Sequence, residues 1–240
     1  MTVTQRLVFL LRRQAHLSRK EFQDYWWDHH APLVASRAAV LGISRYQQAH
    51  VVAHVAPEGA DEFDGIAELW FDGPAPTGTR ETMFRAGAQL LDDERNFIDL
   101  ARSPIFMGEE QVLLEGPQDG LRVTMVMGAV AGVGREAYQR YWLEGHGPAV
   151  LAHNDVWNLR HYVQVHAPAN ADTHRLAVER GAPPAPFGIA EAWYGADAPA
   201  VDEAQADAVR AELFAVDAPF IDYGTSIAFQ SRVQVVVDRS

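Results

Sequence analysis

The chain has 240 residues, of which 48% are hydrophobic, and a formal net charge of -12. This length accommodates one large domain or two small ones. The acidic balance argues against nucleic acid and against an anionic membrane surface as partners. With no cysteine, the chain has no disulfides, no thiolate metal site and no cysteine nucleophile. The apolar run at the N-terminus is too short for a signal peptide, and no segment is long enough to span a membrane, so we expect a cytoplasmic protein.

The first elements in chain order predict alternating strands and helices. Residues 6–13 (RLVFLLRR) are typical of a strand, and Ser18 with Glu21 forms the Ser-x-x-Glu pattern of a helix start. Residues 43–51 and 65–71 have the alternation of two further strands. Thr79 is placed to cap a second helix, and residues 103–114 complete the series as a strand. The predicted order is therefore β-α-β-β-α-β.

The second half of the chain repeats the first. At a shift of 116 residues, the segment YWWDHHAPLV (25–34) matches YWLEGHGPAV (141–150). From residue 65 onward the shift is 123, so GIAELW (65–70) matches GIAEAW (188–193). The seven extra residues fall within 167–186, which is rich in Ala and Pro and is interpreted as a loop. These matches predict two repeats, residues 1–116 and 117–240, joined near residues 114–120.

This element order is that of the ferredoxin-like split βαβ unit, an antiparallel sheet with both helices on one face. The uncovered sheet face of each repeat needs a partner, and the other repeat is the obvious one. We therefore expect an α+β protein in which two tandem ferredoxin-like units pack into a barrel within one chain, with the helices outside. Such a protein is a monomer with a pseudo-dimeric barrel, or a homodimer if exposed sheet edges pair.

A histidine precedes an Xaa-Pro pair in both repeats. Pro32 and Pro148 are expected to interrupt the first helix near residues 28–30 and at the equivalent point of the second repeat, because proline lacks an N–H and disfavours helical geometry in the preceding residue. His30 and His146 would then lie just outside a helix N-terminus, which disfavours the imidazolium. A neutral histidine there can accept a proton. The structural alternative is a packing kink.

Two strands place polar side chains on shared faces. Tyr46, Gln48 and His50 alternate along one strand, as do Tyr162, Gln164 and His166 along its counterpart. We expect these faces to look into the barrel and the intervening residues to face the helices. On the third strands, Glu68 lies between Ile66 and Trp70, and Glu191 between Ile189 and Trp193. A buried glutamate needs a partner, and a histidine or tyrosine is the partner expected here. The acidic run at residues 92–94 is predicted to be a solvated helix face.

The motifs FQDYWWDHHAPLV, RYQQAH, GIAELWF and RNFIDLARSPIF resemble the EthD-like family of the dimeric α+β barrel superfamily. The second repeat carries the matching YQRYWLEGHGPAV, HYVQVH, GIAEAWY and APFIDYGTSIAF, so the resemblance covers nearly the whole chain as two tandem EthD-like domains. The resemblance implies a cleft for small-molecule chemistry. It also implies that His30 and His146 are acid/base residues and that Tyr46 and Tyr162 hold a substrate oxygen. Some relatives use a pocket cysteine, which is lacking here.

The hypothesis that follows is a cofactor-independent isomerase, cyclase or lyase acting on a small, largely apolar cyclic or aromatic carbonyl or lactone compound. The candidate catalytic residues are His30, Tyr46, His50, Glu68, His146, Tyr162, His166 and Glu191. The candidate substrate-binding residues are Trp26, Gln48, Trp70, Phe97, Trp142, Gln164 and Trp193.

Two alternatives remain. Two of His29, His30, His50 and His54 with Glu68 would satisfy a two-histidine, one-carboxylate metal site, or a histidine would bind haem, although no compact metal motif is present. The same aromatic cavity would also suit a protein that binds a small molecule without changing it. No cofactor and no metal are required by the leading hypothesis.

Overall fold

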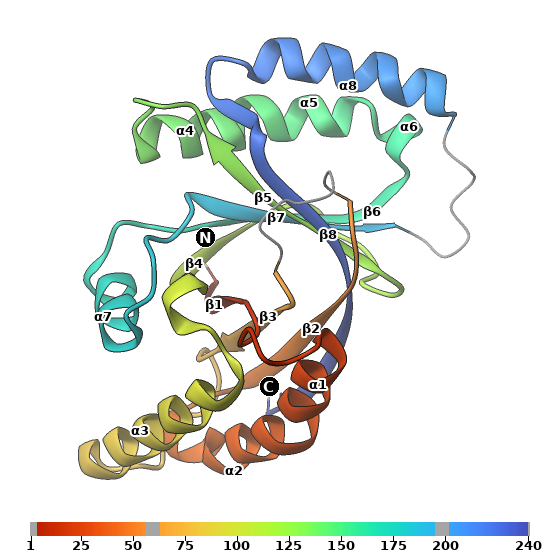
Figure 1. Ribbon diagram of the computed structural model, residues 1–240. Coiled ribbons are helices and arrows are strands. Elements are labelled where there is room, and N and C mark those ends of the chain that lie inside the picture. The colour runs from red at the N-terminus through yellow and green to blue at the C-terminus, as the bar shows by residue number, and fades with distance from the viewer. Residues whose placement is uncertain (1–3, 56–62, 195–201, 240) are drawn as a thin grey trace.

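The computed structural model describes residues 4–55, 63–194 and 202–239. Eight strands form one closed antiparallel barrel in the order β1-β3-β2-β8-β5-β7-β6-β4. Figure 1 shows α1, α2 and α3 on one side of this barrel, α4, α5, α6 and α8 on the other, and α7 beside β4. The expected α+β barrel with external helices is confirmed. None of the helices in the described parts of the chain has the length and apolar character to cross a membrane.

The two halves have closely corresponding elements. The first half contains β1 (Gln5–Leu11), α1 (Arg19–Tyr25), the π-helical turn η1 (Trp26–His30), α2 (Ala31–Leu41), β2 (Arg45–His54), β3 (Gly65–Trp70), α3 (Arg80–Phe97), the 3-10 turn η2 (Leu100–Arg102) and β4 (Ile105–Leu114). The second contains β5 (Arg122–Ala129), α4 (Arg135–Tyr141), the π-helical turn η3 (Trp142–His146), α5 (Gly147–Ala152), α6 (Asn154–Trp157), β6 (Leu159–His166), α7 (Ala171–Arg180), β7 (Gly188–Tyr194), α8 (Glu203–Asp217) and β8 (Ile221–Asp238).

The barrel closes through two equivalent joints. Strand β2 of the first half pairs with β8, and β4 pairs with β6 of the second half. Each half alone would leave these strands as sheet edges with unpaired backbone groups. The sheet order within each half is the same, β4-β1-β3-β2 and β8-β5-β7-β6. Each half thus supplies the hydrogen-bonding partner of the other.

The predicted interruption of the helix at the prolines is wrong. Backbone dihedrals stay helical through His30 and Ala31, and the chain passes from α1 to α2 through η1. The Ala31 N–H bonds the Trp26 carbonyl, five residues back, which is the hydrogen bond of a π-helix. The wider turn accommodates the ring of Pro32, which begins α2 near a position where proline is favoured. His30 therefore lies inside a continuous helix, so the helix-dipole argument for its neutrality does not apply.

The expected orientation of the polar strand faces is also wrong. Ala49 and Val51 point into the barrel and pack with Val8, Phe106 and other apolar side chains of both halves. Tyr46 and Trp26 belong instead to the cluster between the sheet and the helices of the first half. In the second half, Val163 and Val165 point inward while Tyr162 packs with the helices. Both faces of these strands are buried, so the alternation alone did not distinguish inside from outside.

The extra segment of the second repeat contains a helix rather than only a loop. Asn170 caps α7 by accepting from the Thr173 N–H, and Gly181 ends it with a φ of 62°. Thr173 also accepts a 3.1 Å hydrogen bond from the Met107 N–H of β4 through its hydroxyl oxygen. Although α7 belongs by sequence to the second repeat, it is therefore docked against a strand of the first.

Candidate active site

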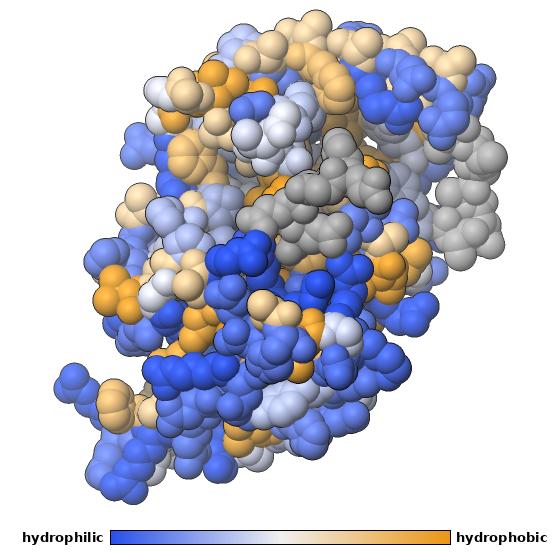
Figure 2. Space-filling model, in the orientation of Figure 1, coloured by the Kyte–Doolittle hydropathy of each residue, from blue (hydrophilic) through white to orange (hydrophobic). Residues whose placement is uncertain are grey.

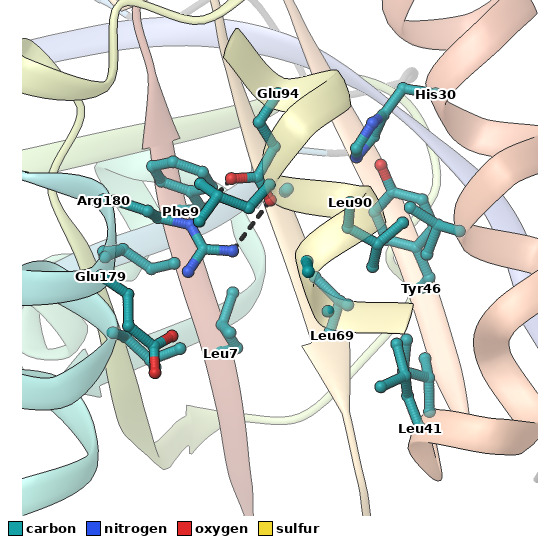
Figure 3. Close-up of a pocket in the computed structure, with 18 of the residues that line it drawn as sticks. Leu7, Phe9, His30, Leu41, Tyr46, Leu69, Leu90, Glu94, Glu179 and Arg180 are labelled. Carbon is teal, nitrogen blue, oxygen red and sulfur yellow. Dashed lines mark hydrogen bonds and ion pairs between the residues drawn. The ribbon is translucent and has the colours of Figure 1, made fainter. Parts of the chain in front are cut away.

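A cavity lies in the first half, between the outer face of the sheet and helices α2 and α3. It has a volume of about 650 Å³, within the range of small-molecule sites. Leu7, Phe9 and Leu69 form its floor on β1 and β3, and Val34 and Leu90 face them from the helices. Figure 3 shows these apolar side chains enclosed by His30 and Tyr46 on one side and by α7 on the other. In Figure 2 the face of this part of the molecule that is turned to the viewer is mostly hydrophilic.

His30 lines this cavity and is oriented by a carboxylate. Its Nδ1 lies 2.7 Å from Asp93 Oδ2, and Tyr25 donates to Asp93 Oδ1 at 2.8 Å. The hydrogen bond from His30 lowers the pKa of Asp93, so the carboxylate is ionised and acts as the acceptor. In the neutral ring the proton is then on Nδ1, and the lone pair is on Nε2, the nitrogen turned away from Asp93. The Phe97 ring packs against the His30 ring, with the two ring centroids 5.1 Å apart.

Tyr46 lies beside His30 in the cavity wall and is held by two donors. Trp26 Nε1 donates to its phenol oxygen at 3.0 Å, and Gln48 Nε2 donates at 2.8 Å. Both lone pairs of the oxygen are thus occupied, and its O–H is the remaining group. Burial raises the pKa of Tyr46, so the hydroxyl keeps its proton at neutral pH. The O–H of Tyr46 is therefore left to donate a hydrogen bond at a residue that lines the cavity.

Behind Tyr46, a chain of hydrogen bonds has a defined direction. The Gln48 amide nitrogen also donates to the Trp26 carbonyl, at 3.1 Å, so its oxygen faces His50 Nε2 at 2.8 Å and accepts from it. Burial lowers the pKa of His50 to about 4, so the ring is neutral at pH 7. His50 stacks on Trp26 with ring centroids 4.7 Å apart. Gln48 and His50 thus orient Tyr46 and do not line the cavity themselves.

Two glycines allow the tryptophans to pack flat on the sheet. A Cβ on Gly65 would lie 2.4 Å from the Trp26 ring, and one on Gly188 would lie 2.6 Å from the Trp142 ring. The Gly-Ile-Ala-Glu start of each third strand is thereby explained by close approach of the indole rings.

Glu68 and Glu191 do not meet a histidine or tyrosine. Inside the barrel, Arg6 bonds Glu68 at 2.8 Å and Glu191 at 2.6 Å, and Arg122 bonds the same two carboxylates at 2.7 and 2.9 Å. Gln47 also donates to Glu68 at 2.8 Å. Burial alone would raise the pKa of Glu68, but the Arg122 and Arg6 guanidiniums lower it below its usual range. The pKa of Glu191 is raised, because burial and the neighbouring Glu68 charge both disfavour its ionised form.

Trp70 and Trp193 belong to this barrel interior rather than to the cavity. The Arg6 and Arg122 guanidiniums lie 5.1 and 5.6 Å from the centroids of the two rings. Both tryptophans also border a second, polar cavity of about 110 Å³. Arg6 and Arg122 were missed in the sequence, although they match at the same shift of 116 and begin both first strands.

The matching site of the second half is built differently. His146 Nδ1 lies 2.9 Å from Asp217 Oδ2, and Asp217 is almost fully buried, with Tyr141 and Tyr223 also donating to it. Stacking of Trp142 on His166 repeats that of Trp26 on His50, and burial likewise lowers the pKa of His166 to about 4.

The phenol of the second half lacks the two donors found in the first. Trp142 Nε1 has no partner among the described residues, and Gln164 reaches the Tyr162 oxygen only at 3.4 Å. Leu113 packs where a Cβ of Gly147 would lie, which explains the glycine at the position of Ala31. His146 and Tyr162 line neither of the two cavities described above.

Of the sequence-derived candidates, the structure brings Trp26, His30 and Tyr46 together at the large cavity. It also reveals Asp93, Glu94 and Arg180, which were missed in the sequence. The acidic run was expected to be solvated, but Asp93 binds His30 and buried Glu94 lines the cavity. At the shift of 123, Asp217 aligns with Glu94 and not with Asp93, although it is Asp93 that binds His30. The alignment of the repeats therefore did not reveal the two His–Asp pairs. Among the described residues, no cluster of three or more His, Asp or Glu is assembled to hold a metal ion.

Comparison with known proteins agrees with this architecture. The EthD domain family matches residues 14–101, which lie in the first half of the chain. A candidate monooxygenase from Fusobacterium nucleatum superposes with a TM-score of 0.50 at 8% identity, covering 98% of this chain and 95% of that one. A search of curated proteins gave no match.

Two further solved structures are similar at lower scores. A candidate chlorite dismutase has a TM-score of 0.49 at 12% identity, covering 98% of this chain and 96% of its own. A heme-binding protein from Thermus thermophilus has a TM-score of 0.46 at 12% identity, covering 96% of this chain and 92% of its own. At such identities the similarity concerns the dimeric α+β barrel fold alone.

Proposed function

We propose that the protein is a cofactor-independent acid/base enzyme, an isomerase, cyclase or lyase, acting on a small, largely apolar cyclic or aromatic carbonyl or lactone compound. One observation carries the proposal. A histidine whose Nδ1 is bound by a carboxylate lines the same apolar cavity as a tyrosine whose oxygen already accepts two hydrogen bonds. This pairs a proton acceptor with an oriented proton donor, which is the requirement for removing a proton next to a carbonyl.

The first chemical step assigns a role to each group. His30 Nε2 takes a proton from the carbon next to the carbonyl, and the electrons of that C–H bond form the C=C bond of an enolate. Tyr46 donates its O–H to the enolate oxygen, where the negative charge develops. Asp93 stabilises the imidazolium, as a carboxylate on the far nitrogen does in other histidine bases. Return of the proton to a different carbon completes an isomerisation, and loss of a β-leaving group from the enolate completes an elimination.

The roles earlier suggested for His50 and Glu68 change accordingly. His50 supports Tyr46 through Gln48, and Glu68 belongs to the arginine–glutamate cluster inside the barrel. Neither contacts the cavity. In the second half, the equivalents His166 and Glu191 have the same structural positions. The proposed chemistry therefore depends on Trp26, His30 and Tyr46 as the residues in contact with substrate, with Asp93 positioning His30.

The proposal can be tested without knowing the natural substrate. The ketone 1-tetralone carries exchangeable protons next to its carbonyl, and their replacement by deuterium in D₂O is followed by NMR. We expect the wild-type protein to accelerate exchange and His30→Gln to lower the acceleration by roughly 100-fold or more. The matched control is His146→Gln, which should exchange like the wild type. Binding of 1-tetralone with no accelerated exchange would contradict the proposal and favour a passive binding protein.

A second candidate, haem or metal binding, is favoured by one feature of the same site. A carboxylate on Nδ1 leaves Nε2 as the remaining nitrogen of His30, a residue that lines the cavity, and metal-binding histidines are likewise held through their other ring nitrogen. His30 would then hold the haem, which would supply redox chemistry when bound. Titration with hemin tests this directly. A saturable Soret band that is lost in His30→Gln and kept in His146→Gln would favour haem over the acid/base proposal.

A further inference from the structure

The wall of the cavity opposite His30 comes from the second repeat. Leu176, Glu179 and Arg180 of α7 line the cavity, although the catalytic candidates all belong to the first repeat. Figure 3 shows Arg180 and Glu179 on the far side of the cavity from His30 and Tyr46, with Leu7 and Leu69 between them. The first-repeat site is thus closed by the segment that makes the second repeat longer than the first.

An ion pair between the repeats fixes the position of this wall. Arg180 Nε and Nη2 each donate to a different oxygen of Glu94, both at 2.9 Å. The two side chains are only 12% and 7% exposed, and the Arg180 guanidinium also lies 5.5 Å from the Phe9 ring centroid. A bidentate pair of this kind is strongly directional because two parallel N–H bonds must be satisfied together. Arg180 is therefore held in one orientation at the edge of the cavity.

The pairing leaves part of the guanidinium available to a ligand. Nε and one hydrogen of Nη2 are occupied by Glu94, whereas Nη1 makes no hydrogen bond within the described parts of the chain. The charge of Arg180 is balanced by Glu94, so this end of the cavity does not require an anionic ligand. It offers hydrogen-bond donors beside the apolar side chains of Leu7 and Leu176.

From these contacts we infer that α7 is a specificity element of the first-repeat site, with Arg180 donating a hydrogen bond to an oxygen acceptor at the end of the ligand opposite the reacting carbonyl. The ligand class is an apolar ring compound with oxygen at both ends. Glu94 is a positioning residue, because it acts by orienting Arg180. The identity of the reacting end rests on the proposed function, whereas the preference for a second oxygen does not.

The preference is measured by binding, with matched probes. Each probe is a 1-tetralone bearing at C6 a methoxy, methoxymethyl or 2-methoxyethyl group, paired with the alkyl compound of equal length. The three ethers move the oxygen outward by one atom at a time. The expected result is that at least one ether binds the wild-type protein roughly tenfold more tightly than its alkyl partner, because a donor that is already charged and oriented gains an acceptor.

Two variants locate that preference. The double variant Glu94→Leu with Arg180→Met removes the ion pair without leaving a buried charge. The variant Arg180→Lys keeps a cation beside Glu94 but lacks the guanidinium donors that Glu94 leaves available to the ligand. Both variants should still bind the alkyl probes, and they should bind each ether with the same affinity as its alkyl partner. Arg210→Met, at an exposed arginine of α8 paired with Asp207 and Glu203, is the control that should keep the preference.

The outcomes separate the inference from the proposed function. Equal binding of every ether and its alkyl partner to the wild-type protein would overturn the role of Arg180, as would a preference that survives in both variants. A preference that disappears in the variants supports the inference whether or not the probes exchange deuterium. Loss of exchange in His30→Gln with an unchanged ether preference would support both assignments independently.

Discussion

His30 and His146 occupy matching points of two repeats, yet they differ in what surrounds them. Asp93, which binds His30, has a side chain that is 19% exposed, whereas Asp217, which binds His146, is 1% exposed and serves three donors. Helix α2 has 11 residues where α5 has 6. The first site has an apolar cavity in front of the histidine, and Leu113 packs against the equivalent turn in the second.

This difference teaches that duplication of a motif does not duplicate a site. The His–carboxylate pair, the tryptophan–histidine stack and the glutamine bond to the π-helical carbonyl are present in both halves. They stabilise the π-helical turn wherever it occurs. A reactive site needs in addition an oriented phenol and an open cavity, and only the first half provides both within the described residues.

The largest expected effect is a loss of stability on mutation of the arginine–glutamate cluster inside the barrel, to which both halves contribute one arginine and one glutamate. Arg6→Met and Arg122→Met should each lower the free energy of unfolding by roughly 3–5 kcal/mol, because each leaves the two buried carboxylates with one arginine instead of two. Urea unfolding followed by tryptophan fluorescence measures both values. A difference of more than about 2 kcal/mol between the two variants would break the equivalence of the halves in the barrel.

The next effect should fall on one half only. Tyr46→Phe removes the proposed donor to the enolate oxygen and should slow deuterium exchange of 1-tetralone by roughly 100-fold. Tyr162→Phe should leave the exchange rate unchanged, because Tyr162 does not line the cavity. The NMR exchange assay compares the two at equal protein concentration. Equal losses in both variants would mean that the second half has an active site as well.

The smallest effect concerns pH and should be similar in the two halves. His50 and His166 each have a pKa lowered to about 4 by burial, so below about pH 6.5 the unfolded state binds protons that the folded state does not. Stability is therefore full above pH 6.5 and falls as the pH approaches 4, by on the order of 2 kcal/mol per histidine.

Two single variants resolve this contribution by half. His50→Gln and His166→Gln should each flatten the pH dependence of urea midpoints between pH 7 and 4.5 to a similar degree. A variant that left the slope unchanged would show that its histidine is already protonated, or equally exposed, in the folded protein.

The element order could largely be predicted from the sequence because it depends on short-range patterns. Ser18 and Thr79 cap helices as expected, and the strands of both halves form the barrel in the expected succession, with α7 added between β6 and β7. The interior could not be assigned because both faces of the strands are buried. The polar face of Tyr46, Gln48 and His50 meets the helix, where Gln48 donates to the Trp26 carbonyl of the π-helical turn beside the bond from the Ala31 N–H.

The site residues were harder to predict because their partners are distant in sequence. His30 and Tyr46 were identified from their repeated motifs, but Asp93 is 63 residues from His30 and was hidden in an acidic run. Arg180 is 86 residues from Glu94 and belongs to a helix interpreted as a loop. The capping pattern of Asn170 and Gly181 was the available signal for that helix.

The most direct test of the central claim is a crystal structure of the protein with 1-tetralone bound. The account predicts the ketone in the first-half cavity, with its oxygen within hydrogen-bonding distance of Tyr46 Oη and the adjacent carbon facing His30 Nε2. A ketone bound against His146 and Tyr162, or in the first-half cavity with its carbonyl turned away from Tyr46, would contradict the account.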